Sequence, residues 1–391
     1  MTQRQILITG ATGFIGCRLA ETAVARGISA VCLVRSWHKA ARLARLPVRM
    51  VHGNMLDKHS LREAVRGCDV VFHCAVDSRP DNHRQINVQG TANIMEAALE
   101  QKVKRVVYLS SIAVYGFWPS QLSVTEDTPC QYTGDPYCDA KIDAEKVALR
   151  YHREAGLPVV ILRPSLVYGP FQSLWAERLI TSIRKDRMVL VNGGNGICNS
   201  LYVDNLIKAM WLATDRENAT GNVFIISDAQ PVTWKRMIES HAVVLNGSQL
   251  PLLEMTVEEI EAARRRALPS SDSSFQMIVR LIGDPRVHQA LYTVPAFARL
   301  ARVARTIFGA LPNGTRRLIP IAPQASQVGC SEGEGIQTPV RSTLPKDEVR
   351  FYSCNVVFSI ERARRILGYE PEIPFSDGMR RTAAWIRWMK L

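Results

Sequence analysis

Tyr137 and Lys141 are the first residues in this sequence whose types and spacing could carry out chemistry. They stand four residues apart in a segment whose pattern continues as a helix to Ala155, so both side chains should lie on one helical face. An ammonium group beside a phenol favours the phenolate and lowers the pKa of Tyr137 from about 10, which makes the phenol a usable acid or base. A Tyr-x-x-x-Lys spacing alone is more often a solvated helix face, so the elements around it must decide.

A glycine-rich turn opens the chain. In "ILITGATGFIG", Gly10, Gly13 and Gly16 stand between an expected first strand and first helix, as a dinucleotide-binding turn requires. Gly10 permits the tight turn, Gly13 lets the backbone approach a pyrophosphate, and Gly16 lets the helix pack on the strand. The free N–H groups at the start of the helix would then receive the phosphates. The same turn contributes three further candidate cofactor-binding residues, Thr12, Phe14 and Ile15. An ordinary glycine-rich turn is the alternative.

The residue after the second expected strand indicates which cofactor is preferred. Enzymes that use NAD place an acidic residue there, which binds the ribose hydroxyls. Here "AVCLVRS" places Arg35 at this point, with Lys39 close behind. A guanidinium fits a 2′-phosphate, so the sequence predicts a preference for NADP(H), with NAD as the second choice. The alternative is that Arg35 only solvates the end of a strand.

Strands and helices alternate through the first part of the chain. Apolar runs such as "QILIT", "SAVCLVR", "DVVFHCA", "RVVYLSS" and "PVVILRP" are separated by helical patterns. This order predicts an α/β fold with a Rossmann-type, doubly wound parallel sheet. We expect a cofactor-binding domain over residues 1–170 with a returning segment at about 197–228. A smaller C-terminal substrate lobe should comprise residues 171–196 and 229–391, with an arginine-rich helical insertion at about 250–345.

Further motifs follow in an order that resembles the extended short-chain dehydrogenase/reductase superfamily, also called the NAD-dependent epimerase/dehydratase family. After the Gly-x-x-Gly-x-x-Gly turn come "HCAV", "NVQGTANIMEAA", "YLSSIAVYG", "YCDAK", "LRPSLVYGP", "YVDNL" and "ISDAQPVTW". The segment "ERARRILGYEPEIPFSDGMRRT" resembles the family's C-terminal closing segment. Only about residues 250–345 lie outside the resemblance.

The resemblance implies roles for particular residues. Ser111 would hold the substrate oxygen by a hydrogen bond, Tyr137 would act as the acid or base, and Lys141 would also bind the nicotinamide ribose. Asn54 and Met55 match positions that touch the adenine, although the family usually has Asp where Asn54 stands. Further residues matching cofactor-binding positions of the family are Cys74, Ala75, Asn87, Pro164, Ser165 and Val167.

The motifs also distinguish branches of the family. Nucleotide-sugar epimerases and dehydratases typically carry an Asn and an Arg for the sugar diphosphate, and the matching positions here are Leu166 and Cys198. A sugar dehydratase would further need an Asp-Glu pair after Ser111, where this chain has Ile112 and Ala113. What remains resembles the 3β-hydroxysteroid dehydrogenase and dihydroflavonol reductase branch. It implies an NADP(H)-preferring oxidoreductase acting on an apolar secondary alcohol or ketone.

Two other functions stay open. A nucleotide-sugar epimerase would use the same three residues with tightly held NAD. A non-catalytic NADP-binding sensor would share the fold, although sensors of this kind tend to lose the serine, tyrosine and lysine that this chain retains.

Composition and charge place further bounds. The 391 residues are 47% hydrophobic, enough for a large core, and the nine cysteines show no Cys-x-x-Cys pair, which favours reduced thiols rather than a metal or disulfide framework. No signal peptide or membrane span is expected, so we expect a cytoplasmic protein. An apolar small-molecule substrate is the expected partner, and a homodimer is compatible with the resemblance.

Much of the net charge of +13 is concentrated in the region between Ala262 and Pro320. Within it, residues 295–311 ("PAFARLARVARTIFGAL") have the pattern of a basic amphipathic helix. The simpler interpretation is a helix of the substrate lobe that packs over the active site. The alternative is peripheral contact with an anionic membrane. Nucleic acid is not an expected partner, because interleaved aromatic residues and a recognisable binding fold are missing.

Overall fold

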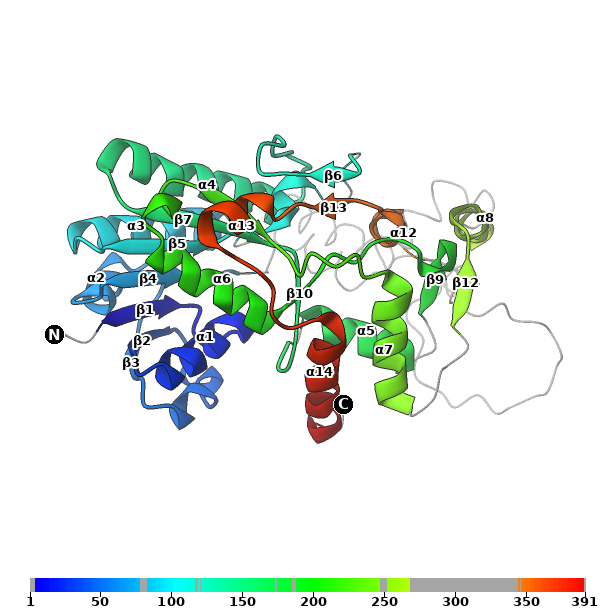
Figure 1. Cartoon of the computed structure of the whole chain (residues 1–391), viewed down its shortest axis with the longest axis horizontal. Helices are drawn as coiled ribbons and strands as arrows, with labels where there is room; N and C mark the ends of the chain where they lie inside the picture. Colours follow the sequence, from blue (N-terminus) through cyan, green and yellow to red (C-terminus); the bar gives the residue numbers. More distant parts are fainter. Residues whose placement is uncertain are drawn as a thin grey trace, which may run out of the picture. The chain divides into compact units, whose positions relative to one another are not determined.

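Seven parallel strands form one sheet in the order β11-β7-β5-β4-β1-β2-β3 (Figure 1). The computed structural model describes residues 4–77, 83–116, 119, 121–172, 174–184, 188–246, 252–267, 344 and 346–389. The strands of the sheet are β1 (Gln5–Thr9), β2 (Ser29–Val34), β3 (Arg49–His52), β4 (Val70–His73), β5 (Arg105–Leu109), β7 (Val159–Pro164) and β11 (Val223–Ile226). Because every neighbouring pair is parallel, helices must carry the chain back between strands, and the expected Rossmann-type fold is confirmed.

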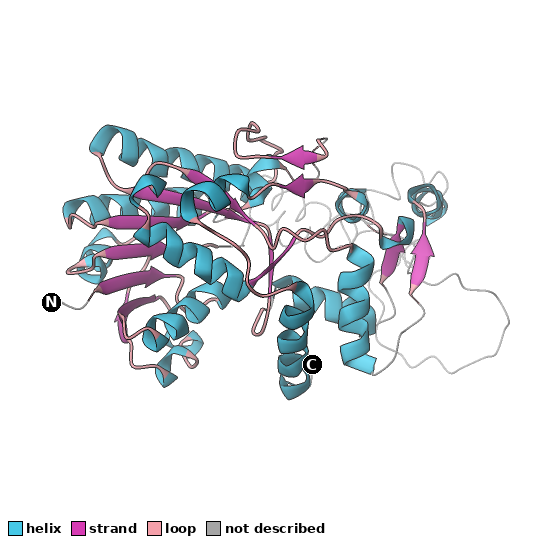
Figure 2. Cartoon of the chain, viewed as in Figure 1, coloured by secondary structure: helices cyan, strands magenta, loops and turns pink. Residues whose placement is uncertain are grey.

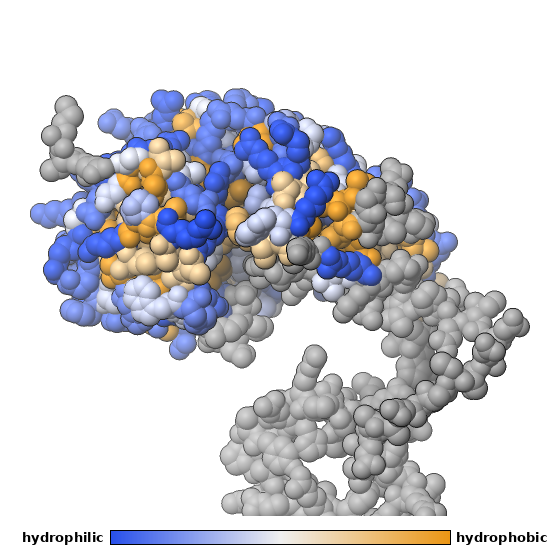
Figure 3. Space-filling view, turned by 90° about the horizontal axis from the view of Figure 1, so that it is seen from below, coloured by the Kyte–Doolittle hydropathy of each residue, from blue (hydrophilic) through white to orange (hydrophobic). Residues whose placement is uncertain are grey.

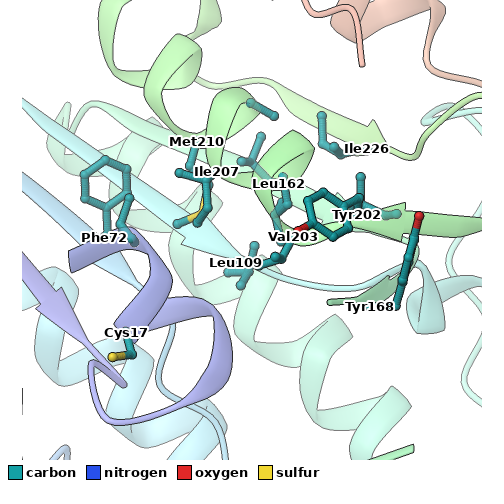
Figure 4. Close-up of a cluster of buried hydrophobic side chains, with 14 of the residues drawn as sticks. Cys17, Phe72, Leu109, Leu162, Tyr168, Tyr202, Val203, Ile207, Met210 and Ile226 are labelled. Carbon is teal, nitrogen blue, oxygen red and sulfur yellow. The ribbon is translucent and has the colours of Figure 1, made fainter. Parts of the chain in front are cut away.

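Alternate residues of the central strands face two separate cores. Ile6 and Ile8 of β1 pack in one hydrophobic cluster and Leu7 in the other, as the two-residue period of a doubly covered strand requires. The first cluster lies under α1 (Phe14–Ala25) and α6 (Val203–Asp215), and its centre includes Phe72 and Met210 (Figure 4). The second lies under α2 (Lys58–Val65), α3 (Gly90–Glu100) and α4 (Pro136–Ala155). Figure 2 shows these helices on both faces of the strands.

The strand order reverses between β1 and β4. From β1 the chain proceeds outward to β2 and β3, and from β4 it proceeds the other way to β5, β7 and β11. In open parallel sheets a ligand crevice forms at this reversal, outside the carboxyl ends of the strands. The segments that follow β1 and β4 therefore border the expected cofactor site.

Short strand pairs and further helices complete the main part of the chain. The chain divides into two compact units, residues 1–257 with 344–391, and residues 258–343. In the first unit, α7 (Trp234–Asn246) packs against α14 (Phe375–Met389) and α5 (Leu174–Arg184). Its remaining elements are β6 (Ser123–Val124), β8 (Leu166–Tyr168), β9 (Val189–Val191), β10 (Ser200–Tyr202), β12 (Leu253–Met255), α12 (Lys346–Ser353), β13 (Val357–Phe358) and α13 (Glu361–Leu367). The second unit is described only in α8 (Val257–Ala267).

In the described part of the chain, three short strand pairs lie outside the seven-stranded sheet. The pairs β8 with β10, β9 with β12 and β6 with β13 are each two-stranded and parallel. Apolar and strongly hydrophilic side chains lie side by side on the face shown in Figure 3. The expected amphipathic helix at 295–311 lies outside the described residues, and the division into cofactor and substrate lobes stays a prediction. Among the described helices, none has both the length and the apolar character needed to span a bilayer.

Candidate active site

The glycine turn joins β1 to α1. Gly10 has a φ of +68°, and a Cβ there would lie 2.8 Å from the backbone of Cys74 and Ala75. A Cβ on Gly16 would lie 2.3 Å from the carbonyl oxygen of Gly10. Both positions therefore require glycine, the first for its conformation and for the close passage of the chain after β4, and the second for close helix packing.

Gly13 is the N-cap of α1, and the space where a side chain would stand is largely open. Among the described residues, a Cβ on Gly13 would come within 4 Å of only the Gly10 carbonyl oxygen, at 3.2 Å. Within the same part of the chain no side chain caps the start of α1, and the first turn of this helix carries no acidic residue. The cradle of backbone N–H groups thus fits the pyrophosphate of a dinucleotide in both shape and charge.

A recess of about 560 Å³, part of it open to solvent, adjoins this turn. It is lined by Gly10, Thr12, Leu33, Arg35, Gly53, Asn54, Met55, Ala75, Val76 and Ile86. Six of these ten residues are among the cofactor-binding positions expected from the sequence. Its walls come from the segments after β1, β2, β3 and β4, so the recess lies where the adenosine half of a dinucleotide would extend from the glycine turn.

Leu33, Gly53, Val76 and Ile86 are lining residues that the sequence did not single out. Leu33 is the next-to-last residue of β2, and Gly53 follows β3 directly. Both stand at carboxyl ends of strands, which is the signal that could have identified them. A Cβ on Gly53 would lie 2.6 Å from a methyl group of Leu33, so a larger residue there would crowd this wall.

Arg35, the residue expected to select the cofactor, forms part of the recess wall and pairs with a carboxylate. Its Nη1 lies 3.6 Å from Oδ2 of Asp77, which follows β4, and the side chains are 52% and 6% exposed. Lys39 ends a short 3₁₀ helix (Trp37–Lys39) and is exposed outside the set of recess-lining residues. Asp77 was not predicted, because nothing in the sequence indicates that these segments meet.

Asn54 and Met55 follow β3 and line the recess. The side-chain oxygen of Asn54 accepts a hydrogen bond from the backbone N–H of Leu56 at 3.1 Å, which shapes this loop. Met55 is buried, and its carbonyl oxygen accepts a hydrogen bond of 2.9 Å from the side chain of Asn93 on α3. Asn54 thus acts on its own loop in this structure, whereas Met55 joins the loop to α3.

Ser111, Tyr137 and Lys141 come together beyond the end of β5. Asp135 caps α4 by accepting hydrogen bonds of 2.9 Å from the backbone N–H groups of Tyr137 and Cys138, with Pro136 at the first helical position. This start places Tyr137 and Lys141 on the first turns of the helix. The Ser111 side chain is close enough to Tyr137 to lower the pKa of the phenol. The Lys141 Nζ donates a 2.8 Å hydrogen bond to the carbonyl oxygen of Leu109 and lies 6.0 Å from the Tyr137 ring centre.

The pKa of Tyr137 is shifted in the direction opposite to the one expected from the Tyr137–Lys141 spacing. Burial raises its pKa above the ordinary value, and the nearby Ser111 lowers it in part. Burial also lowers the pKa of Lys141 to about 8, against the smaller opposing effect of Glu145. Partial burial of Tyr137 and nearly complete burial of Lys141 disfavour their charged forms, which the spacing alone could not reveal.

A buried polar network that the sequence did not indicate supports this region. Thr9, at the end of β1, hydrogen-bonds His73 Nδ1 at 2.8 Å, and the other ring nitrogen of His73 lies 2.9 Å from the hydroxyl of Thr91. The His73 ring stacks on Tyr108 at 5.2 Å between centres. Burial, followed by the charge of Lys141, lowers the pKa of His73 to about 3. The neutral ring therefore ties the ends of β1 and β4 to α3 beneath the site.

The other residues predicted to bind the cofactor lie outside the set of recess-lining residues. Asn87 is buried and holds the chain after β4: its side chain accepts from the N–H of Asp77 at 2.9 Å and donates to the carbonyl oxygen of Asp77 at 3.1 Å. Cys74 is close enough to Lys141 for the charge of the lysine to lower its pKa, although burial raises that pKa to about 12. Phe14 and Ile15 are half-buried on α1, and Pro164, Ser165 and Val167 stand where β7 passes into β8.

The positions that would bind a sugar diphosphate carry apolar or neutral side chains. Leu166 begins β8, and Cys198 is buried in the larger hydrophobic cluster. Ile112 and Ala113 form the first residues of a short 3₁₀ helix after β5, where a carboxylate pair would be needed for dehydration. These positions provide neither a cation for a diphosphate nor an acid pair for elimination of water.

Comparison with known proteins agrees with this geometry. The family model described as "NAD dependent epimerase/dehydratase family" matches residues 6–227. A 4-hydroxy-2-methyl-3-oxo-4-farnesyl-3,4-dihydroquinoline-1-oxide ketoreductase of Stigmatella aurantiaca is 28% identical over 73% of this chain and 85% of its own length. The 3beta-hydroxysteroid-dehydrogenase/decarboxylase isoform 1 of Arabidopsis thaliana is 26% identical over 97% and 79%.

A solved structure has the same fold. UDP-glucose 4-epimerase of Thermotoga maritima, determined with UDP-glucose, superimposes with a TM-score of 0.67 over 99% of this chain and all of its own. At 15% sequence identity, this likeness concerns the fold alone.

Proposed function

Because the chain belongs to the NAD-dependent epimerase/dehydratase family, we propose that it is an NADP(H)-preferring oxidoreductase for a large apolar secondary alcohol or ketone. The family assignment makes the protein an NAD(P)-dependent enzyme of the extended short-chain dehydrogenase/reductase type, similar to hydroxysteroid dehydrogenases. We further propose the direction of the reaction, the substrate class, the cofactor preference and the catalytic roles of Ser111, Tyr137 and Lys141.

One observation carries the proposal: a serine near a tyrosine and a buried lysine lie beyond β5, on the edge of the sheet that also holds the glycine turn. Strands β5, β4 and β1 are consecutive neighbours in this sheet. The carboxyl ends of parallel neighbours meet at one edge, so a dinucleotide that begins at Gly13 can extend toward Tyr137.

The residues present fit a nicotinamide dinucleotide, which supplies or accepts the hydride when bound. Gly10, Gly13 and Gly16 shape the cradle for the pyrophosphate, and Arg35 presents a guanidinium for a 2′-phosphate. Lys141, whose Nζ donates to the carbonyl oxygen of Leu109, would bind the ribose next to the reacting ring.

The proposed chemistry uses a phenol that remains protonated. In the reducing direction Tyr137 donates its proton to the carbonyl oxygen of the substrate, and Ser111 donates a hydrogen bond to the same oxygen. The raised pKa of Tyr137 suits this direction, because the phenol keeps its proton until the oxygen needs it. In the oxidising direction the proton returns to Tyr137.

Two observations support an apolar substrate. The relatives named as a farnesyl-dihydroquinoline-oxide ketoreductase and a 3beta-hydroxysteroid dehydrogenase act, by their names, on large and largely apolar molecules. In this chain Leu166 and Cys198 stand where sugar-nucleotide enzymes place diphosphate-binding groups. A keto or secondary hydroxyl group on a steroid, isoprenoid or long-alkyl body is therefore the proposed substrate class.

A cofactor-oxidation assay tests the proposal. Purified protein with NADPH is offered a panel of steroid ketones, long-chain 3-oxo esters and isoprenoid ketones, and the loss of absorbance at the nicotinamide band is followed. We expect turnover with at least one apolar ketone and none with UDP-glucose. Conversion of UDP-glucose without added cofactor would instead establish the epimerase alternative. Cofactor binding without turnover of any of these compounds would favour the sensor.

A further inference from the structure

Arg35 and Asp77 face each other at the recess from different segments of the chain. Arg35 follows β2, and Asp77 follows β4, directly after the wall residues Ala75 and Val76. The 3.6 Å separation of Arg35 Nη1 and Asp77 Oδ2 brings the guanidinium within ion-pair range, although Arg35 remains half-exposed. Asp77 is 6% exposed, so its charge is screened less than that of a surface carboxylate.

The backbone of Asp77 is held independently of its carboxylate. The amide side chain of Asn87 receives the N–H of Asp77 at 2.9 Å and donates to its carbonyl oxygen at 3.1 Å. These two hydrogen bonds form a closed pair between one side chain and one backbone unit. Asp77→Asn removes the negative charge and leaves these two hydrogen bonds intact, because neither of them involves the carboxylate.

We infer that Asp77 is a positioning residue that limits the preference for NADP(H), by holding Arg35 in competition with the cofactor's 2′-phosphate. The inference rests on the proposed function. A guanidinium that already faces a carboxylate presents less net positive charge, and the phosphate must draw Arg35 away from Asp77 or approach both. NADH carries no 2′-phosphate, so its affinity depends much less on this pair. The structure thus points to a site that accepts both cofactors more evenly than Arg35 alone would predict.

Asp77→Asn tests this inference by removing the charge at nearly constant volume. Titration calorimetry with NADPH and with NADH on the full chain measures both affinities. We expect NADPH to bind about three- to tenfold more tightly than to wild type, and NADH to change by less than about twofold. Asp77→Glu, which keeps the carboxylate, should restore a ratio near that of wild type. A melting curve for each variant shows that the protein is folded.

Variants in the Arg35→Gln background distinguish an effect of Asp77 through Arg35 from direct repulsion between Asp77 and the 2′-phosphate. If Asp77 acts through Arg35, Asp77→Asn should change NADPH affinity by less than about twofold when Arg35 is already absent. Equal tightening in both backgrounds would overturn this mechanism. Asp127→Asn is the matched control, because Asp127 is 81% exposed, pairs with Arg362 at 2.6 Å and does not line the recess.

The outcomes distinguish this inference from the proposed function. If wild-type protein binds both cofactors but Asp77→Asn leaves their affinity ratio unchanged, the inference is wrong and the proposed function stands. If wild-type protein binds neither cofactor, the proposed function fails and the inference fails with it.

Discussion

At the scale of single residues, the proposed chemistry depends most on the hydroxyl group of Tyr137. Tyr137→Phe removes only this group and should lower turnover by about 10²- to 10⁴-fold, the usual contribution of a positioned acid or base. Cofactor affinity should stay near that of wild type. Steady-state kinetics on an identified ketone and calorimetry with NADPH measure the two effects.

Tyr132→Phe is the matched control for this variant. Tyr132 is half-exposed, and its hydroxyl donates to Asp143 at 2.6 Å and accepts from Lys146 at 2.9 Å. Loss of this surface network should leave turnover unchanged. If the Tyr137→Phe enzyme keeps more than about half of wild-type activity, the role proposed for Tyr137 is wrong.

Arg35 provides a second prediction at this scale. Arg35→Asp replaces a phosphate partner by a like charge and places a carboxylate beside Asp77. We expect NADPH affinity to fall by about 10- to 100-fold, and the preference to move toward NADH. Calorimetry with both cofactors measures this, and Arg150→Asp, at an exposed position on α4, is the control. An unchanged NADPH affinity would remove Arg35 from the cofactor site.

At the scale of elements, the glycine turn needs close packing of α1 at Gly16 and open space for the phosphates at Gly13. Substitutions can separate these two requirements. Gly16→Ala places a methyl group 2.3 Å from the Gly10 carbonyl oxygen, so α1 must move away from the turn. We expect a loss of about 1–3 kcal/mol in the free energy of unfolding, measured by urea denaturation. Gly13→Ala meets its nearest atom at 3.2 Å and should cost less stability.

The variant that loses less stability, Gly13→Ala, should be the one whose cofactor affinity falls more. The Cβ of Gly13→Ala lies on the open side of the cradle, where the phosphates must approach, so this variant should stay folded but bind NADPH weakly. Near-wild-type affinity in Gly13→Ala would show that the pyrophosphate does not sit at this turn.

Asp228 joins three elements and predicts how stability depends on pH. Its carboxylate follows β11 and accepts hydrogen bonds from the backbone N–H of Tyr202 and, at 2.7 Å, from Asn205 on α6. Asn205 in turn donates to the carbonyl oxygen of Ile373, in the segment before α14. Burial raises the pKa of Asp228 to about 7, against the lowering effect of these hydrogen bonds.

The sign of this pH dependence follows from whether the folded or the unfolded chain holds the proton on Asp228. Between about pH 4 and 7 the folded protein keeps a proton on Asp228 that the unfolded chain has lost, so this group makes the fold less stable as pH rises through that window. Asp228→Asn cannot ionise. Its free energy of unfolding, relative to wild type, should therefore rise by about 1.4 kcal/mol per pH unit between these values.

Urea denaturation at several pH values tests the linkage. Comparison with wild type is essential, because the lowered pKa of His73 acts in the opposite direction: it makes the fold more stable as pH rises from about 3 to about 6.5. Parallel stability curves for Asp228→Asn and wild type would show that Asp228 is already ionised in the folded protein at low pH.

At the scale of the whole molecule, the distribution of charge leads to a prediction. Between Ala262 and Pro320 the sequence has ten arginines and two aspartates, which gives 10 − 2 = +8 of the total +13. If residues 295–311 contact anionic lipid, the protein should sediment with phosphatidylserine-containing vesicles at low salt and be released by high salt. Changing Arg299, Arg302 and Arg305 together to Gln should weaken binding.

Neutral vesicles are the control for this experiment. Equal sedimentation with neutral and anionic vesicles, or none with either, would leave a helix of the substrate lobe that packs over the active site as the remaining interpretation. The cofactor affinity of the triple variant should equal that of wild type, because the described residues that line the recess all lie between Gly10 and Ile86 in the sequence.

The sequence by itself determined the features that depend on short stretches of chain. The alternation of apolar runs and helical patterns predicted the parallel sheet, because each strand covered on both faces must be a continuous apolar run. The glycine turn and the first turns of α4 were also predictable, because Gly10, Asp135 and Pro136 specify backbone geometry within a few residues. Of the ten residues that line the recess, Gly10, Thr12 and Arg35 were expected from such local patterns, and Asn54, Met55 and Ala75 from the family resemblance.

Only the tertiary structure decided which distant groups meet and how dry their surroundings are. The pairing of Arg35 with Asp77, and of Thr9 and Thr91 with His73, follows from the reversal of strand order between β1 and β4, which no local pattern encodes. The raised pKa of Tyr137 has the same origin. A four-residue spacing places an ammonium near a phenol, but burial decides whether desolvation or attraction dominates, and burial is a property of the packed protein.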